Sequence, residues 1–64
     1  MSNIGRNLTM LMYDKKVTQR ELAKAAGCSE NMIATIVSGK KMPPLRILVK
    51  IAERLDVTVD EILK

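Results

Sequence analysis

Basic side chains gather in one short part of this 64-residue chain, where they can bind an anionic partner. Residues 39–50 contain no acid, and this segment carries a charge of +4 from Lys40, Lys41, Arg46 and Lys50. Ammonium and guanidinium groups supply the positive charge and hydrogen-bond donors that phosphates and carboxylates accept. Residues 51–64 instead carry −2, which favours one face toward an anion and another turned away from it. A solvated lysine-rich loop is the alternative.

The most regularly patterned stretch, residues 18–37, is neutral, because its two bases and two acids balance. It holds hydroxyl, carboxylate and amide side chains at Ser29, Glu30, Asn31 and Thr35. These groups exchange hydrogen bonds with a partner rather than attract it by net charge. The chain therefore separates charge from hydrogen-bonding chemistry along its length.

The composition argues against an enzyme. The sequence has no histidine, no metal-ligand cluster and no phosphate-cradling glycine loop, so we expect no catalysis, cofactor or metal. The length predicts a single domain, 1–64. A single cysteine, no signal peptide and no long apolar run indicate a cytoplasmic protein. Cys28 is expected to pack as a small hydrophobe, with a thiol switch as the alternative.

Apolar residues recur at helical spacing, which predicts an all-α fold of five short helices. A first helix, capped by Ser2 or Asn3, is expected to fade around residues 14–16. Thr18 and Glu21 form a capping-box pattern for a second helix, which Gly27 ends. Ser29 caps a third helix, which ends at residues 38–39.

Pro43 and Pro44 then interrupt the chain in a loop. A fourth helix follows, and its predicted inner face contains Leu45, Leu48, Ile51, Ala52 and Leu55. Thr58 and Glu61 repeat the capping-box pattern for a last helix, in which Ile62 and Leu63 are expected to pack inward.

The second and third helices must approach closely where they cross. Ala23 on the inner face leaves room for this approach, and Gly27 adopts a left-handed turn without steric cost. The apolar contacts at the crossing are predicted to come from Leu22, Ala26, Cys28, Ile33 and Ile36.

Together these motifs resemble the XRE-like family, the Cro and phage-repressor type of helix-turn-helix domain. The stretch VTQRELAKAAGCSENMIATI resembles the helix-turn-helix itself, at about residues 18–37. IGRNLTML resembles the first helix of that family, GKKMPPL its loop, and LVKIAERLDVTVDEIL its closing pair of helices. The resemblance implies a five-helix, lambda-repressor-like domain that binds operator DNA, usually as a homodimer, and regulates transcription.

In such a fold the third helix reads base edges in the major groove, while basic side chains and helix N-termini hold phosphates. The base-reading candidates are Ser29, Glu30, Asn31, Met32 and Thr35. Asn31 is the foremost of them, because its carboxamide pairs bidentately with adenine. Glu30 can accept from a cytosine amino group or simply favour the helix start, and Met32 can contact DNA or simply be exposed.

The phosphate-binding candidates that the resemblance implies are Thr18, Gln19, Lys40, Lys41 and Arg46. For Thr18 the alternative is a role as a helix cap alone. One pair of positions departs from the family pattern. Many members pair an arginine of the first helix with an acid at the end of the third, whereas the matching residues here are Met12 and Val37. Any contact between these two is expected to be hydrophobic.

We therefore predict a sequence-specific regulator that binds double-stranded DNA, a repressor acting as a homodimer on an inverted-repeat operator. The expected dimer surface is the final helix region around Val57, Val59, Ile62 and Leu63. The alternative is a protein-interaction module, such as an antitoxin or co-regulator, whose third helix or Met10–Met12 side binds another protein. Salt separates the two, because phosphate-driven binding weakens steeply as salt rises.

Overall fold

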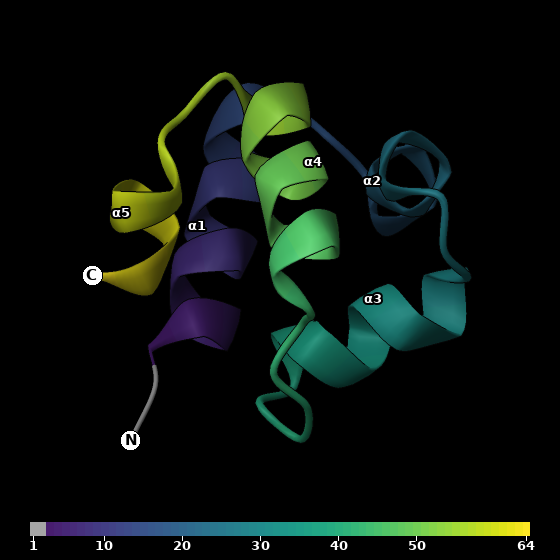
Figure 1. Cartoon of the computed structure of the whole chain (residues 1–64). Coiled ribbons are helices and arrows are strands. Elements are labelled where there is room, and N and C mark those ends of the chain that lie inside the picture. Colours follow the sequence, from purple (N-terminus) through teal and green to yellow (C-terminus); the bar gives the residue numbers. More distant parts are fainter. Residues whose placement is uncertain (1–2) are drawn as a thin grey trace.

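The computed structural model describes residues 3–64, which form five α-helices and no strand (Figure 1). The helices are α1 (Ile4–Lys15), α2 (Gln19–Ala26), α3 (Glu30–Val37), α4 (Leu45–Leu55) and α5 (Val59–Leu63). The predicted all-α class is confirmed. Ser2 lies outside the described residues. Asn3 is the N-cap residue of α1, one of the two predicted, but its side chain makes no hydrogen bond to the helix.

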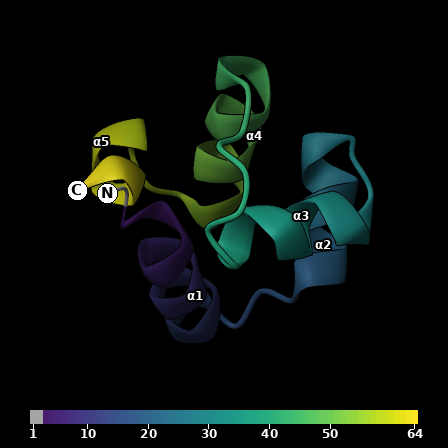
Figure 2. The ribbon, with the colours of Figure 1, turned by 90° about the horizontal axis from the view of Figure 1, so that it is seen from below.

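Helices α1 and α4 occupy the centre of the molecule, with α5 on one side and the α2–α3 pair on the other (Figure 1). α2 packs against α3 and α4, while α1 packs against α3 and α5. Seen from below, the loop between α3 and α4 crosses in front of α4 (Figure 2). No helix within residues 3–64 is long and apolar enough to cross a membrane.

The core is entirely aliphatic and draws on every helix. Its buried side chains are Ile4, Leu8, Val17, Leu22, Ala23, Ala26, Ile33, Ile36, Ile47, Leu48, Ile51, Ala52, Leu55 and Ile62. Burying one Leu, Ile or Val side chain fully stabilises a fold by roughly 1.5–3 kcal/mol, so this set supplies the main driving force for folding. Among the described residues no polar or charged side chain is buried.

Two predicted core positions are wrong. Leu45 is 70% exposed and Leu63 is 42% exposed, whereas Ile47 and Ile62 are buried. Neighbouring residues of a helix point about 100° apart, since the helix has about 3.6 residues per turn. Burial of Ile62 therefore turns Leu63 outward, and the core-facing stripe of α4 begins at Ile47.

The turns are set by local hydrogen bonds and by left-handed residues. Thr18 and Glu21 form the predicted capping box, with Thr18 N–H donating to Glu21 Oε1 at 2.9 Å and Glu21 N–H donating to Thr18 Oγ1 at 3.1 Å. At α5 only the second of these two bonds forms, from Glu61 N–H to Thr58 Oγ1. Gly27 is left-handed with φ of 74°, as predicted.

Gly5 brings the start of α1 into direct contact with the end of α3. A methyl group at Gly5 would overlap the carbonyl oxygen of Val37. Because glycine has no side chain, the two backbones can pack without a gap. This close approach fixes the C-terminal end of α3 against the rest of the domain.

Gly5→Ala should therefore destabilise the domain, by about 1–3 kcal/mol, because the added methyl forces the two backbones apart. Elsewhere in a helix, replacing glycine with alanine raises stability by roughly 0.5–1 kcal/mol. The matched control is Ala25→Gly at an exposed position of α2, which should cost about that amount. Denaturant unfolding measures both, and a Gly5→Ala protein as stable as the parent would contradict the close contact.

Candidate nucleic-acid interface

The start of α3 presents polar groups because its other side is committed to the core. Ile33 and Ile36 are both 0% exposed, which fixes the rotation of the helix about its axis. Ser29 caps the helix, accepting a hydrogen bond at 3.0 Å from Met32 N–H. Glu30 and Asn31 consequently lie exposed at the first turn.

The five base-reading candidates lie together, but they are not equally available. Ser29, Glu30 and Asn31 are exposed, whereas Met32 and Thr35 are half-buried. Met32 packs against the core, and the Thr35 hydroxyl donates to the Asn31 carbonyl oxygen at 2.8 Å. Among the hydrogen bonds of residues 3–64, none uses the Asn31 carboxamide. Asn31 therefore offers a complete donor–acceptor pair to a partner.

The first turn of α2 lies beside the start of α3, because Arg20 Nε is 3.6 Å from Glu30 Oε2. Gln19 is the first residue of α2 and is half-buried. Thr18 Oγ1 accepts from Glu21 N–H and lies 3.1 Å from Glu21 Oε1, to which it donates. The Thr18 hydroxyl is thus engaged in the cap, the alternative role left open by the sequence.

The loop between α3 and α4, called the basic loop below, follows directly from the end of α3. Gly39, with φ of 83°, redirects the chain, and Lys40, Lys41 and Arg46 are all exposed. Pro43 is buried and attaches the loop to the domain. An open hollow of about 370 Å³ lies between this loop and the start of α1, and Arg6 and Lys41 both line it. Arg6 and Lys41 lie at the C-terminal end of α3, since Val37 and Ser38 line the same hollow.

Met12 and Val37, the two positions at which the sequence departs from the pattern of the family it resembles, are both half-buried and pack against the core. They are apolar, as the sequence indicates. Of the four residues predicted for a dimer surface, Ile62 is fully buried within the chain and cannot contribute. Val57 and Val59 are half-buried, and Leu63 is exposed.

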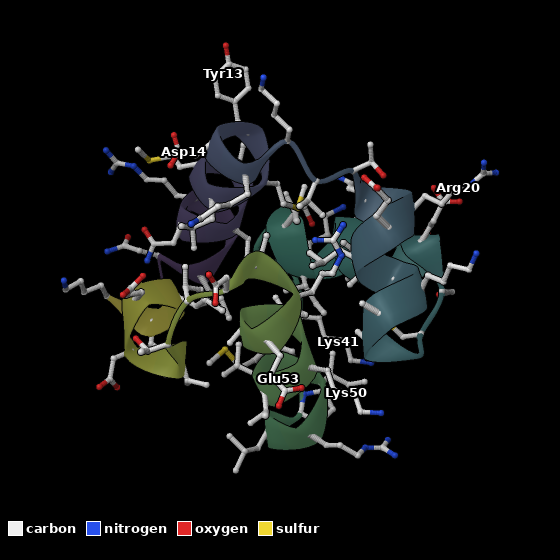
Figure 3. The ribbon with its side chains drawn as sticks, turned by 90° about the horizontal axis from the view of Figure 1, so that it is seen from above. Tyr13, Asp14, Arg20, Lys41, Lys50 and Glu53 are labelled. Carbon is white, nitrogen blue, oxygen red and sulfur yellow. The ribbon has the colours of Figure 1, made fainter. Side chains whose placement is uncertain are left out.

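Two ion pairs that the sequence did not predict extend from the first turn of α2. Arg20 Nε lies 3.6 Å from Glu30 Oε2, and Arg54 Nη2 lies 3.7 Å from Glu21 Oε2. The first pair joins α2 to the start of α3, and the second joins α2 to α4. Figure 3 shows Arg20 extending from the outer side of α2, away from α4.

The capping box also sets the ionisation of Glu21. The backbone N–H of Thr18, then its hydroxyl, and then Arg54 stabilise the charged carboxylate and lower the pKa of Glu21 below 4.5. A lowered pKa means that the folded state binds this proton less readily than the unfolded chain does. The stabilisation by Glu21 is therefore present above pH 4.5 and is lost as the pH falls through the lowered pKa.

We expect Glu21→Gln to reduce the free energy of unfolding above pH 4.5, and the difference from the parent to shrink as the pH falls below that value. Denaturant unfolding across this range measures it. Arg54→Ala should keep most of this pH dependence, because Thr18 is the main cause of the lowered pKa. A difference that stays constant with pH would contradict the role of the carboxylate.

A family model described as helix-turn-helix matches residues 11–62, which include α2, α3 and the basic loop. The chain belongs to the XRE-type helix-turn-helix family. This family consists of DNA-binding regulators. Among curated proteins, none matches the sequence of this chain.

Solved structures of regulators share the fold of this XRE-type domain. The clp gene regulator ClgR from Corynebacterium glutamicum is 30% identical with a TM-score of 0.88, and the alignment covers 94% of this chain and 64% of that one. The restriction-modification controller C.AhdI from Aeromonas hydrophila is 25% identical with a TM-score of 0.87, covering 94% and 91%. The N-terminal DNA-binding domain of SinR from Bacillus subtilis is 27% identical with a TM-score of 0.87, covering 97% and 91%. The five helices are thus those of the lambda-repressor-like fold, and the chain spans less than two thirds of the ClgR chain.

Proposed function

We propose that this protein is a sequence-specific regulator of transcription that binds double-stranded DNA, acting as a repressor and as a homodimer on an inverted-repeat operator. The observation that carries the proposal is that α3 has an exposed polar first turn and is followed at its other end by the acid-free loop with Lys40 and Lys41. The proposal implies a cytoplasmic protein, because its partner is the DNA of the cell.

The polar start of α3 suits the base edges of DNA, and the basic segment after it suits the phosphates. The major groove admits an α-helix, and base edges there are distinguished by hydrogen bonds. The carboxamide of Asn31 and the carboxylate of Glu30 provide such bonds at the first turn of α3. Phosphates attract cations, which Lys40 and Lys41 of the loop and Arg46 at the start of α4 supply within a segment that contains no acid. Base contacts are therefore assigned to α3, and phosphate contacts to the segment that follows it in the sequence.

The relatives support the regulatory role. SinR is represented by a DNA-binding domain, ClgR is a gene regulator, and C.AhdI controls a restriction-modification system. Repression is the simplest regulatory mechanism for a DNA-binding domain of this size, since occupying an operator blocks other proteins. For the dimer, Leu63 is 42% exposed at the end of α5 and offers an apolar contact to a second copy.

A protein-interaction module is the second candidate, and a specific observation favours it. Met10 is 61% exposed and Tyr13 is 88% exposed, and both belong to α1. A related structure contains SinR in complex with the protein SinI. Binding through an apolar surface such as this one responds little to salt, whereas phosphate contacts weaken steeply with it.

Lys40 and Lys41 should contribute affinity without specificity. Changing both to alanine should weaken binding to every DNA sequence and reduce the slope of log affinity against log salt by roughly one unit per lost phosphate contact. Fluorescence anisotropy at several salt concentrations measures the slope. Lys64→Ala, a lysine outside the basic loop, is the control and should leave the salt slope unchanged. A double variant with the affinity and slope of the parent would remove the loop from the interface.

Asn31 should determine which base pair is preferred. Asn31→Ala should cost about 1–3 kcal/mol on the preferred site and flatten the preference at one base pair per half-site. Non-specific affinity should hardly change, because no charge is lost. Binding to all single base-pair variants of the site measures this, with Asn3→Ala as a control at an exposed position outside α3. An unchanged preference for base pairs in Asn31→Ala would contradict the assignment of base recognition to Asn31.

On DNA we expect a symmetric dimer whose half-site centres lie about one helical turn, ~34 Å, apart. Symmetry follows because two copies that pair through one surface present their α3 helices with two-fold symmetry. Footprinting at saturation measures the protected region. Protection of a single, unrepeated half-site by one subunit would refute the dimer.

A further inference from the structure

We propose that Arg20 is a positioning residue for Glu30, and that this ion pair makes the Glu30 carboxylate a reader of one cytosine in each half-site. The inference rests on the proposed function and deepens it. It starts from the distance of 3.6 Å between Arg20 Nε and Glu30 Oε2, which links the first turn of α2 to the first residue of α3.

Arg20 pairs with Glu30 because the nearer acid is already engaged. Glu21, its neighbour on α2, accepts from Thr18 through Oε1 and faces Arg54 through Oε2. The two charged residues of this turn therefore point to different helices. Glu21 is directed toward α4, and Arg20 extends along the outer side of α2 toward α3 (Figure 3).

The ion pair reduces the electrostatic repulsion between the Glu30 carboxylate and DNA phosphates. An unpaired carboxylate that approaches DNA meets phosphates of the same charge, which opposes binding. With Arg20 beside it, Glu30 approaches as part of a neutral pair. The contact of the guanidinium is with Oε2, and the Glu30 carboxylate accepts no hydrogen bond from the described residues. Oε1 can therefore accept a hydrogen bond from the amino group of cytosine in the major groove.

The pair contributes to recognition rather than to folding. The Arg20 and Glu30 side chains are 83% and 57% exposed, and exposed ion pairs add little to stability. Removing either partner should therefore leave the domain folded. Its effect should be visible in the choice of DNA sequence, which a merely structural role would not change.

The experiment compares Arg20→Ala, Glu30→Gln and the double variant with the parent protein. The control is Arg54→Ala, which breaks the matched ion pair on the α4 side. Affinity is measured for the preferred site and for every single base-pair change within a half-site, after thermal melting has shown each variant to be folded. Arg20→Lys is included to test whether a cation alone restores the preference.

We expect Glu30→Gln and Arg20→Ala to reduce the preference for cytosine at the same position, each about tenfold. The double variant should lose no more than either single variant, because the two residues act as one unit. Arg20→Lys should retain part of the preference, and Arg54→Ala should retain all of it.

Three results would overturn the proposal. An equal loss of affinity for all sequences in Arg20→Ala, with a shallower salt slope, would make Arg20 a phosphate contact instead. A second result is that Arg20→Ala and Glu30→Gln both bind DNA but lose preference at different base pairs, or lose none. That result would show that the ion pair has no role in recognition, and it would leave the proposed function unaffected. Failure of the parent to bind any DNA in preference to another would overturn both.

Discussion

The burial of Ile33 and Ile36 is the interaction on which the rest of this structure depends. α3 contains eight residues, too few for a stable isolated helix in water, so it persists because these two side chains lie in the core. Their burial also fixes which residues point outward, since side-chain directions along a helix are set by its period. Ser29 secures the beginning of α3, and the contact with Gly5 secures its end. The exposed face is thus a consequence of the core.

The arrangement explains why the most patterned part of a basic protein is neutral. Residues 18–37 must form two packed helices and present hydrogen-bonding groups, and both tasks are served mainly by uncharged side chains, while the four charges of the stretch sum to zero. Arg20 and Glu30 illustrate this, because they neutralise each other across the two helices. The acid-free cluster of positive charge lies outside this stretch, in the segment after Gly39, where it does not disturb the packing of α2 on α3. In the proposed function, affinity for DNA and selectivity among DNA sequences can then vary independently.

Features governed by nearby residues could be predicted from the sequence. The capping box of Thr18 and Glu21 and the left-handed Gly27 depend on a few neighbouring residues, and both are confirmed. The left-handed Lys16 and Asp56 could not be predicted, because residues other than glycine rarely adopt a positive φ. The Gly5 contact and the Arg20–Glu30 pair join residues of different helices, whose mutual placement only the fold supplies. The contacts of the site with DNA remain predictions.

The central claim is that the start of α3 and the following basic loop form one DNA-binding surface. The most direct measurement is the change in backbone amide NMR shifts when a duplex carrying the preferred site is added to the ¹⁵N-labelled protein. The account predicts the largest changes in residues 18–20, 29–35 and 39–46, and small ones on the exposed side of α1 around Met10 and Tyr13. Changes confined to α1 and α5, with α3 and the loop unaffected, would contradict it.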